Sequence, residues 1–195
     1  NECLLEIKNI INKKIIGDIC GANIYHGENI KNFHIYEDYK NIYAAKKNLG
    51  GGVILSQIHE IDYCCFLFGL PSAVYATGGK YSKLKIDVED YVNILLKYNA
   101  KRGNKFSVNM TLDYLQNPKR RELFITGSKG SLKWDYYKDE IVLKFYNGKS
   151  KKISFKLKDR NDLFLKEVKY FIERTKKNKF LQPSFIDGYN CVRIT

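Results

Sequence analysis

The chain is 195 residues long, with 44% hydrophobic and 14% aromatic residues, which excludes a disordered protein and is enough for a packed core. Its formal net charge of +13 first suggests nucleic-acid binding. However, only six of the 34 basic residues are arginine and the lysines are spread along the chain, whereas specific recognition of nucleic acids relies on arginine, so we do not expect that function.

The first third of the chain is predicted to be mostly helical, with one strand and one long loop. Apolar residues at helical spacing indicate a helix at each end of this region, and the second begins after three consecutive glycines and ends at Gly69. The expected elements are a helix over 3–13, a strand over 18–25, an ordered loop over 26–39, a short helical piece over 39–48 and one continuous helix over 54–68.

After Pro71 the hydrophobic pattern changes to the alternation that is typical of strands with one covered face. The clearest case is 106–114, where Phe106, Val108, Met110, Leu112 and Tyr114 share one side. The other expected strands cover 74–78, 92–98, 122–126, 131–137, 141–146 and 153–157, followed by helices over 161–177 and 184–194. We therefore predict one α+β domain over residues 1–195, an open, mainly antiparallel sheet with helices on one face.

The distribution of cysteine and histidine gives no sign of a disulfide framework or a metal site. The five cysteines have no repeated spacing, and the three histidines lie far apart. No signal-peptide pattern opens the chain, and no apolar run is long enough to span a bilayer. We expect a soluble, cytoplasmic protein with buried free thiols that makes no membrane contact and, because it opens at Asn1, forms part of a longer protein.

The helix after the glycine triplet contains a row of polar side chains. Ser56, His59 and Asp62 are three residues apart and would share one helix face. One interpretation is that His59 points into a cleft and exchanges a proton with a substrate hydroxyl. The other is that His59 and Asp62 only satisfy each other or the loop beneath them, because unpaired buried polar groups are costly. The triplet itself lets the backbone approach another surface closely, such as a substrate, or simply forms a tight turn.

Several segments together resemble a known enzyme family. They are "KKIIGDI" near the start, "EDYKNIYAAKKNLGGGVILSQIHEIDYCCFLFGLPSAVYA", "RRELFITGSKGSLKWD", and the closing "DLFLKEVKYFIERTKKNKFLQPSFIDGYNCVRI". In this order they resemble the C-terminal domain of the glucose–fructose oxidoreductase, inositol dehydrogenase and rhizopine-catabolism oxidoreductase family. The glycine triplet with "HEID" and the preceding tyrosine is the most specific part.

The resemblance implies a fold and a set of site residues. Family members are two-domain enzymes in which a dinucleotide-binding Rossmann domain precedes an open sheet that binds substrate and pairs subunits. The chain would then be a dihydrodipicolinate-reductase-like C-terminal domain without its Rossmann domain, and residues 1–14 would form a helix bordering that domain. His59 matches the catalytic histidine, and Tyr43 and Lys46 match residues that line the substrate pocket. Ser56 and Asp62 are assigned to the same pocket, where Asp62 would mainly orient the helix.

The chain departs from the family pattern at three points. It has no G-x-G-x-x-G turn after a strand, and it lacks the Glu-Lys-Pro motif that holds the family's catalytic lysine. It also has Leu55 and Ser56 where many members have an acidic residue before the histidine. We expect no cofactor-binding residue in this segment, NAD or NADP in the full-length protein, and no activity without the N-terminal domain.

Two functions from different classes follow. The first is the substrate-binding part of an NAD(P)-dependent oxidoreductase that acts on a sugar, a nucleotide-sugar or a cyclic polyol. The second is a non-catalytic module that keeps the fold for oligomerisation or ligand binding, which the change at Ser56 favours. In both cases the open sheet is expected to pair subunits in a homo-oligomer, because a large face with aromatic residues is unlikely to stay exposed. The solvent-side residues of the best strand, such as Ser107, Asn109 and Thr111, would then make the contact, or the opposite face would make it if helices cover these residues.

Overall fold

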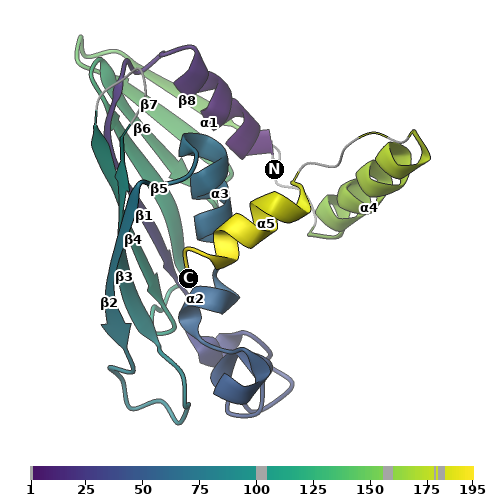
Figure 1. The fold of residues 1–195 in the computed structure, drawn as a ribbon. Helices are drawn as coiled ribbons and strands as arrows, with labels where there is room; N and C mark the ends of the chain where they lie inside the picture. Colours follow the sequence, from purple (N-terminus) through teal and green to yellow (C-terminus); the bar gives the residue numbers. More distant parts are fainter. Residues whose placement is uncertain (1, 100–104, 156–159, 178, 180–182) are drawn as a thin grey trace.

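In a computed structural model the chain forms an open eight-stranded sheet with helices packed against one face (Figure 1). The structure describes residues 2–99, 105–155, 160–177, 179 and 183–195. The strands are β1 (Ile19–Gly27), β2 (Ala73–Gly79), β3 (Tyr91–Tyr98), β4 (Phe106–Asp113), β5 (Arg120–Gly127), β6 (Gly130–Asp135), β7 (Glu140–Phe145) and β8 (Ser150–Ser154). The α-helices are α1 (Glu2–Asn12), α2 (Val53–Ser56), α3 (His59–Phe68), α4 (Arg160–Lys176) and α5 (Phe185–Val192), with 3-10 helices at Ile30–Asn32, Tyr43–Ala45 and Lys47–Leu49.

The order of the strands confirms an α+β fold with a mainly antiparallel sheet. Across the sheet the strands follow the order β2-β3-β4-β1-β5-β6-β7-β8. Strand β1 is parallel to β4, and all other strand pairs recorded among the described residues are antiparallel. The first strand of the chain therefore lies in the centre of the sheet, between two regions in which neighbouring strands follow one another along the chain.

The core lies between the sheet and the helices. On β4, Val108, Met110 and Leu112 are buried toward the helices while Asn109 is exposed on the opposite face, as the alternating pattern predicted. Full burial of one such aliphatic side chain stabilises the fold by about 1.5–3 kcal/mol. The face of the sheet away from the helices is open, and we refer to it below as the open face (Figure 1).

The prediction of one continuous helix over 54–68 is wrong. The structure has two helices here, α2 and α3, which are separated by Gln57 and Ile58. Gln57 has φ −111° and ψ 25°, its side chain is 1% exposed, and its Nε2 donates a hydrogen bond to the carbonyl oxygen of Asp113, 3.1 Å away. This contact with the end of β4 holds Gln57 out of helical geometry, so a tertiary interaction overrides the local pattern.

The short helical piece expected over 39–48 is present as two 3-10 helices, Tyr43–Ala45 and Lys47–Leu49. Two smaller expectations need correction. Strand β8 begins at Ser150 rather than at residue 153, and residues 156–157 of the expected strand lie outside the described residues. Cys20 is exposed rather than buried, at the start of β1, where the pairing with β5 shifts register between Ile19 and Gly21.

Helix α4, which precedes the closing helix α5, stands away from the sheet (Figure 1). Its apolar side chains Phe164, Val168 and Phe171 are more than half exposed. None of the described helices is long and apolar enough to cross a membrane.

Candidate functional site

The glycine triplet packs closely against the backbone of the preceding turn. A side-chain carbon on Gly51 would lie 2.8 Å from the carbonyl oxygens of both Ala44 and Lys46, and the backbone N–H of Gly51 donates to the Lys46 carbonyl at 2.9 Å. Gly52 has φ 114°, a conformation that favours glycine, and the Glu89 carboxylate occupies the space that a side chain at this position would need. The close approach that the triplet permits is thus to the turn over 43–46 and to Glu89.

Glu89 fixes the start of α2. Its Oε1 accepts a hydrogen bond from the Ile54 backbone N–H at 3.2 Å, and its carbonyl oxygen accepts one from Val53 at 3.2 Å. A carboxylate at this position satisfies N–H groups that have no partner within the helix. The sequence did not indicate this role, because Glu89 lies 35 residues after Ile54, from whose N–H it accepts a hydrogen bond.

Tyr114 joins the glycine segment to Ser56. Its hydroxyl lies 2.7 Å from the carbonyl oxygen of Gly52 and 2.6 Å from the hydroxyl of Ser56. Burial raises the pKa of Tyr114 well above its ordinary value, so the phenol is neutral and can donate a hydrogen bond. The sequence placed Tyr114 on the inward face of a strand, and a partner for its hydroxyl could have been expected because buried tyrosines usually have one.

Replacing Tyr114 by phenylalanine should lower the free energy of unfolding by about 1–3 kcal/mol, because the Gly52 carbonyl and the Ser56 hydroxyl would lose a buried partner. Urea unfolding followed by circular dichroism measures this loss. Tyr81→Phe is the matched control, since Tyr81 is exposed in the loop between β2 and β3 and should change stability by less than about 0.5 kcal/mol. Equal effects of the two substitutions would contradict the role given to Tyr114.

His59 is the first residue of α3, and its side chain is exposed. The structure records no hydrogen bond to its ring from any described residue. The row of three polar residues does not lie on one helix, because Ser56 ends α2 and contacts Tyr114. Asp62 lies one turn into α3, and its Oδ1 accepts a hydrogen bond from the Cys191 thiol of α5 at 3.7 Å. Ser56 and Asp62 thus have structural partners, whereas His59 faces outward.

Tyr43 and Lys46 lie in the turn that contacts the glycine triplet. Tyr43 begins a 3-10 helix and is 51% exposed, while Lys46 is half-buried between the two 3-10 helices. The structure therefore places Tyr43, Lys46 and Ser56 around one backbone junction, and His59 at the start of the next helix. None of the pockets described below contains His59 among its recorded lining residues.

Glu60, the residue after His59, forms a buried charged cluster that the sequence analysis missed. Glu60 is 0% exposed, its Oε1 accepts a hydrogen bond from Arg121 Nε at 2.5 Å, and its Oε2 lies 3.0 Å from His26 Nδ1 in a poorly aligned contact. Burial alone would raise the pKa of Glu60, but contact with His26 and the charge of Arg121 hold it below its ordinary value. The cluster anchors the first turn of α3 to β1 and β5, which bear His26 and Arg121.

The sequence contains a signal for this buried cluster. Glu60 shares a helix face with Cys64 and Leu67, both of which are buried. A charged residue in a buried stripe needs a charged or hydrogen-bonding partner. Within the described residues, no three His, Cys, Asp or Glu side chains are grouped so that they could hold a metal ion.

Comparison with known proteins identifies the chain. A family model described as the GFO/IDH/MocA C-terminal domain matches residues 4–133, about two-thirds of the sequence. The chain belongs to this family. The match includes the glycine triplet, His59 and most of the sheet, but it does not extend to α4 and α5. No curated protein matches the GFO/IDH/MocA chain by sequence.

Solved oxidoreductases share the fold of this GFO/IDH/MocA domain. An NAD-binding oxidoreductase from Klebsiella pneumoniae superimposes with a TM-score of 0.79 at 16% identity, over 97% of this chain and 58% of that one. An oxidoreductase from Agrobacterium radiobacter, solved with NAD+, L-tartaric acid and magnesium, gives 0.76 at 16% identity, over 98% and 57%. A levoglucosan dehydrogenase solved with NADH and levoglucosan gives 0.77 at 19%, over 96% and 57%. The chain thus spans little more than half the length of these structures.

Proposed function

We propose that the chain is the substrate-binding part of an NAD(P)-dependent oxidoreductase that acts on a sugar, a nucleotide-sugar or a cyclic polyol. The observation that carries this proposal is the position of His59. It is exposed at the start of a helix that a buried ion cluster anchors to the sheet, while its neighbours Ser56 and Asp62 have structural partners. The family match and the titles of the similar structures, which name NAD+ or NADH and levoglucosan or tartaric acid, support it.

In this proposal His59 accepts the proton of the substrate hydroxyl. Tyr43 and Lys46 donate hydrogen bonds to other hydroxyl groups and orient the sugar, since both are accessible in the turn beside the glycine triplet. The nicotinamide accepts the hydride when it is bound. The residues of this chain do not form a dinucleotide turn, so the cofactor would be held by a part of the protein outside it.

Ser56 favours a second candidate, a non-catalytic ligand-binding or oligomerisation module. The family resemblance implies an acidic residue at the position of Ser56 or Leu55, and here the Ser56 hydroxyl contacts Tyr114. His59 therefore receives no carboxylate from this position to polarise its ring.

Turnover by the complete protein, meaning the product of the whole natural reading frame that contains this chain, separates the two candidates. The protein would be incubated with NAD or NADP and a panel of sugars, nucleotide-sugars and cyclic polyols, and reduction of the nicotinamide followed by absorbance. The oxidoreductase proposal expects a saturable rate with at least one compound. Saturable sugar binding without reduction of either cofactor would support the non-catalytic module instead.

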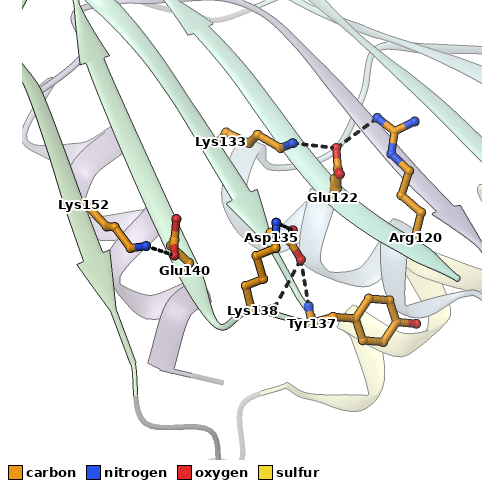
Figure 2. A network of polar contacts seen from close by, with 8 residues as sticks. All are labelled: Arg120, Glu122, Lys133, Asp135, Tyr137, Lys138, Glu140 and Lys152. Atoms are coloured by element: carbon orange, nitrogen blue, oxygen red, sulfur yellow. Dashed lines mark hydrogen bonds and ion pairs between the residues drawn. The ribbon is translucent and has the colours of Figure 1, made fainter. Parts of the chain in front are cut away.

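We also propose that the open face pairs two copies of the chain. The part of this face on β5–β8 is covered by charged residues that pair with one another, as Figure 2 shows for Glu122 with Arg120 (3.0 Å) and Lys133 (3.2 Å). The part on β2–β4 is less charged and exposes Tyr75 and Leu95, around a shallow hollow of about 420 Å³. Apolar surface of this kind is a candidate for a subunit contact.

Sedimentation of the chain at micromolar concentration tests this pairing. The wild type should sediment as a dimer, and Leu95→Arg should shift it to a monomer, because the substitution places a charge in the less charged half of the open face. Leu5→Arg is the control, since Leu5 is also exposed but lies on α1, on the helical side of the sheet. A wild-type monomer, or a dimer that survives Leu95→Arg, would exclude this interface.

A further inference from the structure

A second open pocket lies beside the turn that contains Lys46. Residues of the 40–48 segment and of the loop between β2 and β3 form its walls, and its volume is about 320 Å³. Four of its eight lining residues are lysines, namely Lys40, Lys46, Lys80 and Lys85, whereas 28 of the 195 residues of the chain are lysine. The pocket is therefore enriched in lysine beyond the general composition of the chain.

The positive charge of this lysine pocket is largely uncompensated. Lys40 Nζ pairs with Asp38 at 2.8 Å, but no ion pair with a described residue is recorded for Lys46, Lys80 or Lys85. The one acidic residue in the lining, Asp87, accepts a hydrogen bond from the Lys47 backbone N–H at 2.8 Å through its Oδ1. Positive charges that line the same pocket repel one another when no carboxylate pairs with them, and a bound anion would offset this repulsion.

The two walls of the lysine pocket are fixed to one another and to the fold. The Asp87 N–H donates to the Ala45 carbonyl oxygen at 3.3 Å, which joins the two segments. The loop that bears Lys80 and Lys85 is held by Asp90, which is 0% exposed and accepts hydrogen bonds from the Tyr81 and Ser82 backbone N–H groups at 2.8 and 3.1 Å. A pocket whose walls are ordered in advance loses little conformational entropy when a ligand binds.

We propose that the lysine pocket binds the phosphoryl group of a phosphorylated or nucleotide-linked sugar. This assignment rests on the proposed function, because Lys46 belongs both to the candidate substrate site and to the pocket. A phosphoryl group has the charge that three unpaired ammonium groups require, and lysine binds phosphate as a point charge. The lysines converge on one hollow instead of following a stripe, and no arginine or aromatic residue lines it, which favours a small anion over a nucleic acid.

Titration of the 195-residue chain with pyrophosphate, followed by calorimetry, tests the site without any cofactor. The wild type should bind saturably, and the double variant Lys80→Glu, Lys85→Glu should bind at least about tenfold more weakly, a loss of about 1.4 kcal/mol. Lys149→Glu, Lys151→Glu is the matched control, because it changes the net charge equally on the edge around β8, and it should stay within about twofold of the wild type. Equal weakening by both pairs, or no saturable binding below about 10 mM, would overturn the proposal.

A competition experiment identifies the source of the phosphoryl group, and a second double variant tests whether weaker binding is caused by misfolding. Uridine diphosphate or glucose 1-phosphate should compete with pyrophosphate, whereas tighter competition by adenosine 2′-phosphate would mean that the pocket serves a cofactor and would overturn the substrate assignment. The double variant Lys80→Gln, Lys85→Gln should also bind pyrophosphate more weakly, by a smaller factor than the glutamate variant, and its circular dichroism spectrum should be unchanged. Because these titrations involve neither turnover nor His59, a complete protein without dehydrogenase activity would leave their outcome unchanged.

Discussion

Replacing Glu60 by alanine should lower the free energy of unfolding by about 3–5 kcal/mol, because it leaves the partly buried Arg121 guanidinium and the His26 ring beside an empty buried space. Removing one partner from a buried ion cluster lowers the free energy of unfolding by more than the intact cluster contributes to it, since the remaining charge stays buried without a counter-charge. Such a loss is a large part of the stability of a domain of this size. Urea unfolding followed by circular dichroism measures it directly.

The chain contains a matched control for this prediction. His34 and Glu37 also form a histidine–glutamate pair, at 2.9 Å, but both side chains are more than one-third exposed. Glu37→Ala should therefore lower the free energy of unfolding by less than about 1 kcal/mol, because the attraction between two exposed groups is little stronger than their interaction with water. Similar losses for Glu60→Ala and Glu37→Ala would show that the buried cluster does not hold α3 to the sheet.

The same cluster makes stability depend on acid. The folded state holds the pKa of Glu60 below its ordinary value of 4.5, so this carboxylate contributes its stability above about pH 4.5 and loses it as the pH falls toward the folded value. The unfolded chain binds the proton more readily in that range, and the free energy of unfolding must decrease with decreasing pH. In Glu60→Gln the free energy of unfolding should decrease less steeply with decreasing pH. An equally steep decrease in the variant would contradict the role given to the Glu60 carboxylate.

Replacing His59 by alanine in the complete protein should lower kcat by about 10²–10⁴, the usual contribution of a positioned acid or base. KM for the sugar should change little, because the histidine acts on the proton that is transferred and the proposed binding groups are Tyr43 and Lys46. The exposed position of His59 at the start of α3 makes a folding defect improbable. Steady-state kinetics with the sugar found in the panel measure both constants.

His34→Ala is the control for this substitution, since His34 is half-exposed in the loop after β1 and contacts Glu37 and Tyr36. It should leave turnover within about twofold of the wild type. Unchanged turnover in the His59 variant would remove this residue from the mechanism and favour the non-catalytic module.

The strands and their inward faces could be predicted because they depend on local alternation. The buried face of β4, with Val108, Met110 and Leu112, follows directly from that pattern. Alternation says nothing about which strands pair, so the insertion of β1 between β4 and β5 could not be obtained from it. The family resemblance implied an open sheet but assigned no partner to β1.

The geometry around the proposed site residues could not be predicted from their spacing. The spacing of Ser56, His59 and Asp62 describes one helix face only if the helix is continuous, and the contact of Gln57 with Asp113, 56 residues away, breaks it. Long-range contacts of this kind leave no local signal. Glu60 did leave one, because it is a charged residue in a buried stripe and such a residue needs a partner.

If His59 faces the reacting group of a bound sugar, its imidazole ring must sense the binding of that sugar. The chain has three histidines, so their ring resonances in an NMR spectrum of the complete protein can be assigned by single substitutions. Addition of the sugar that is turned over should shift the His59 resonances saturably, while those of His34 stay in place. A spectrum in which His59 does not respond at a saturating concentration of that sugar would contradict the claim.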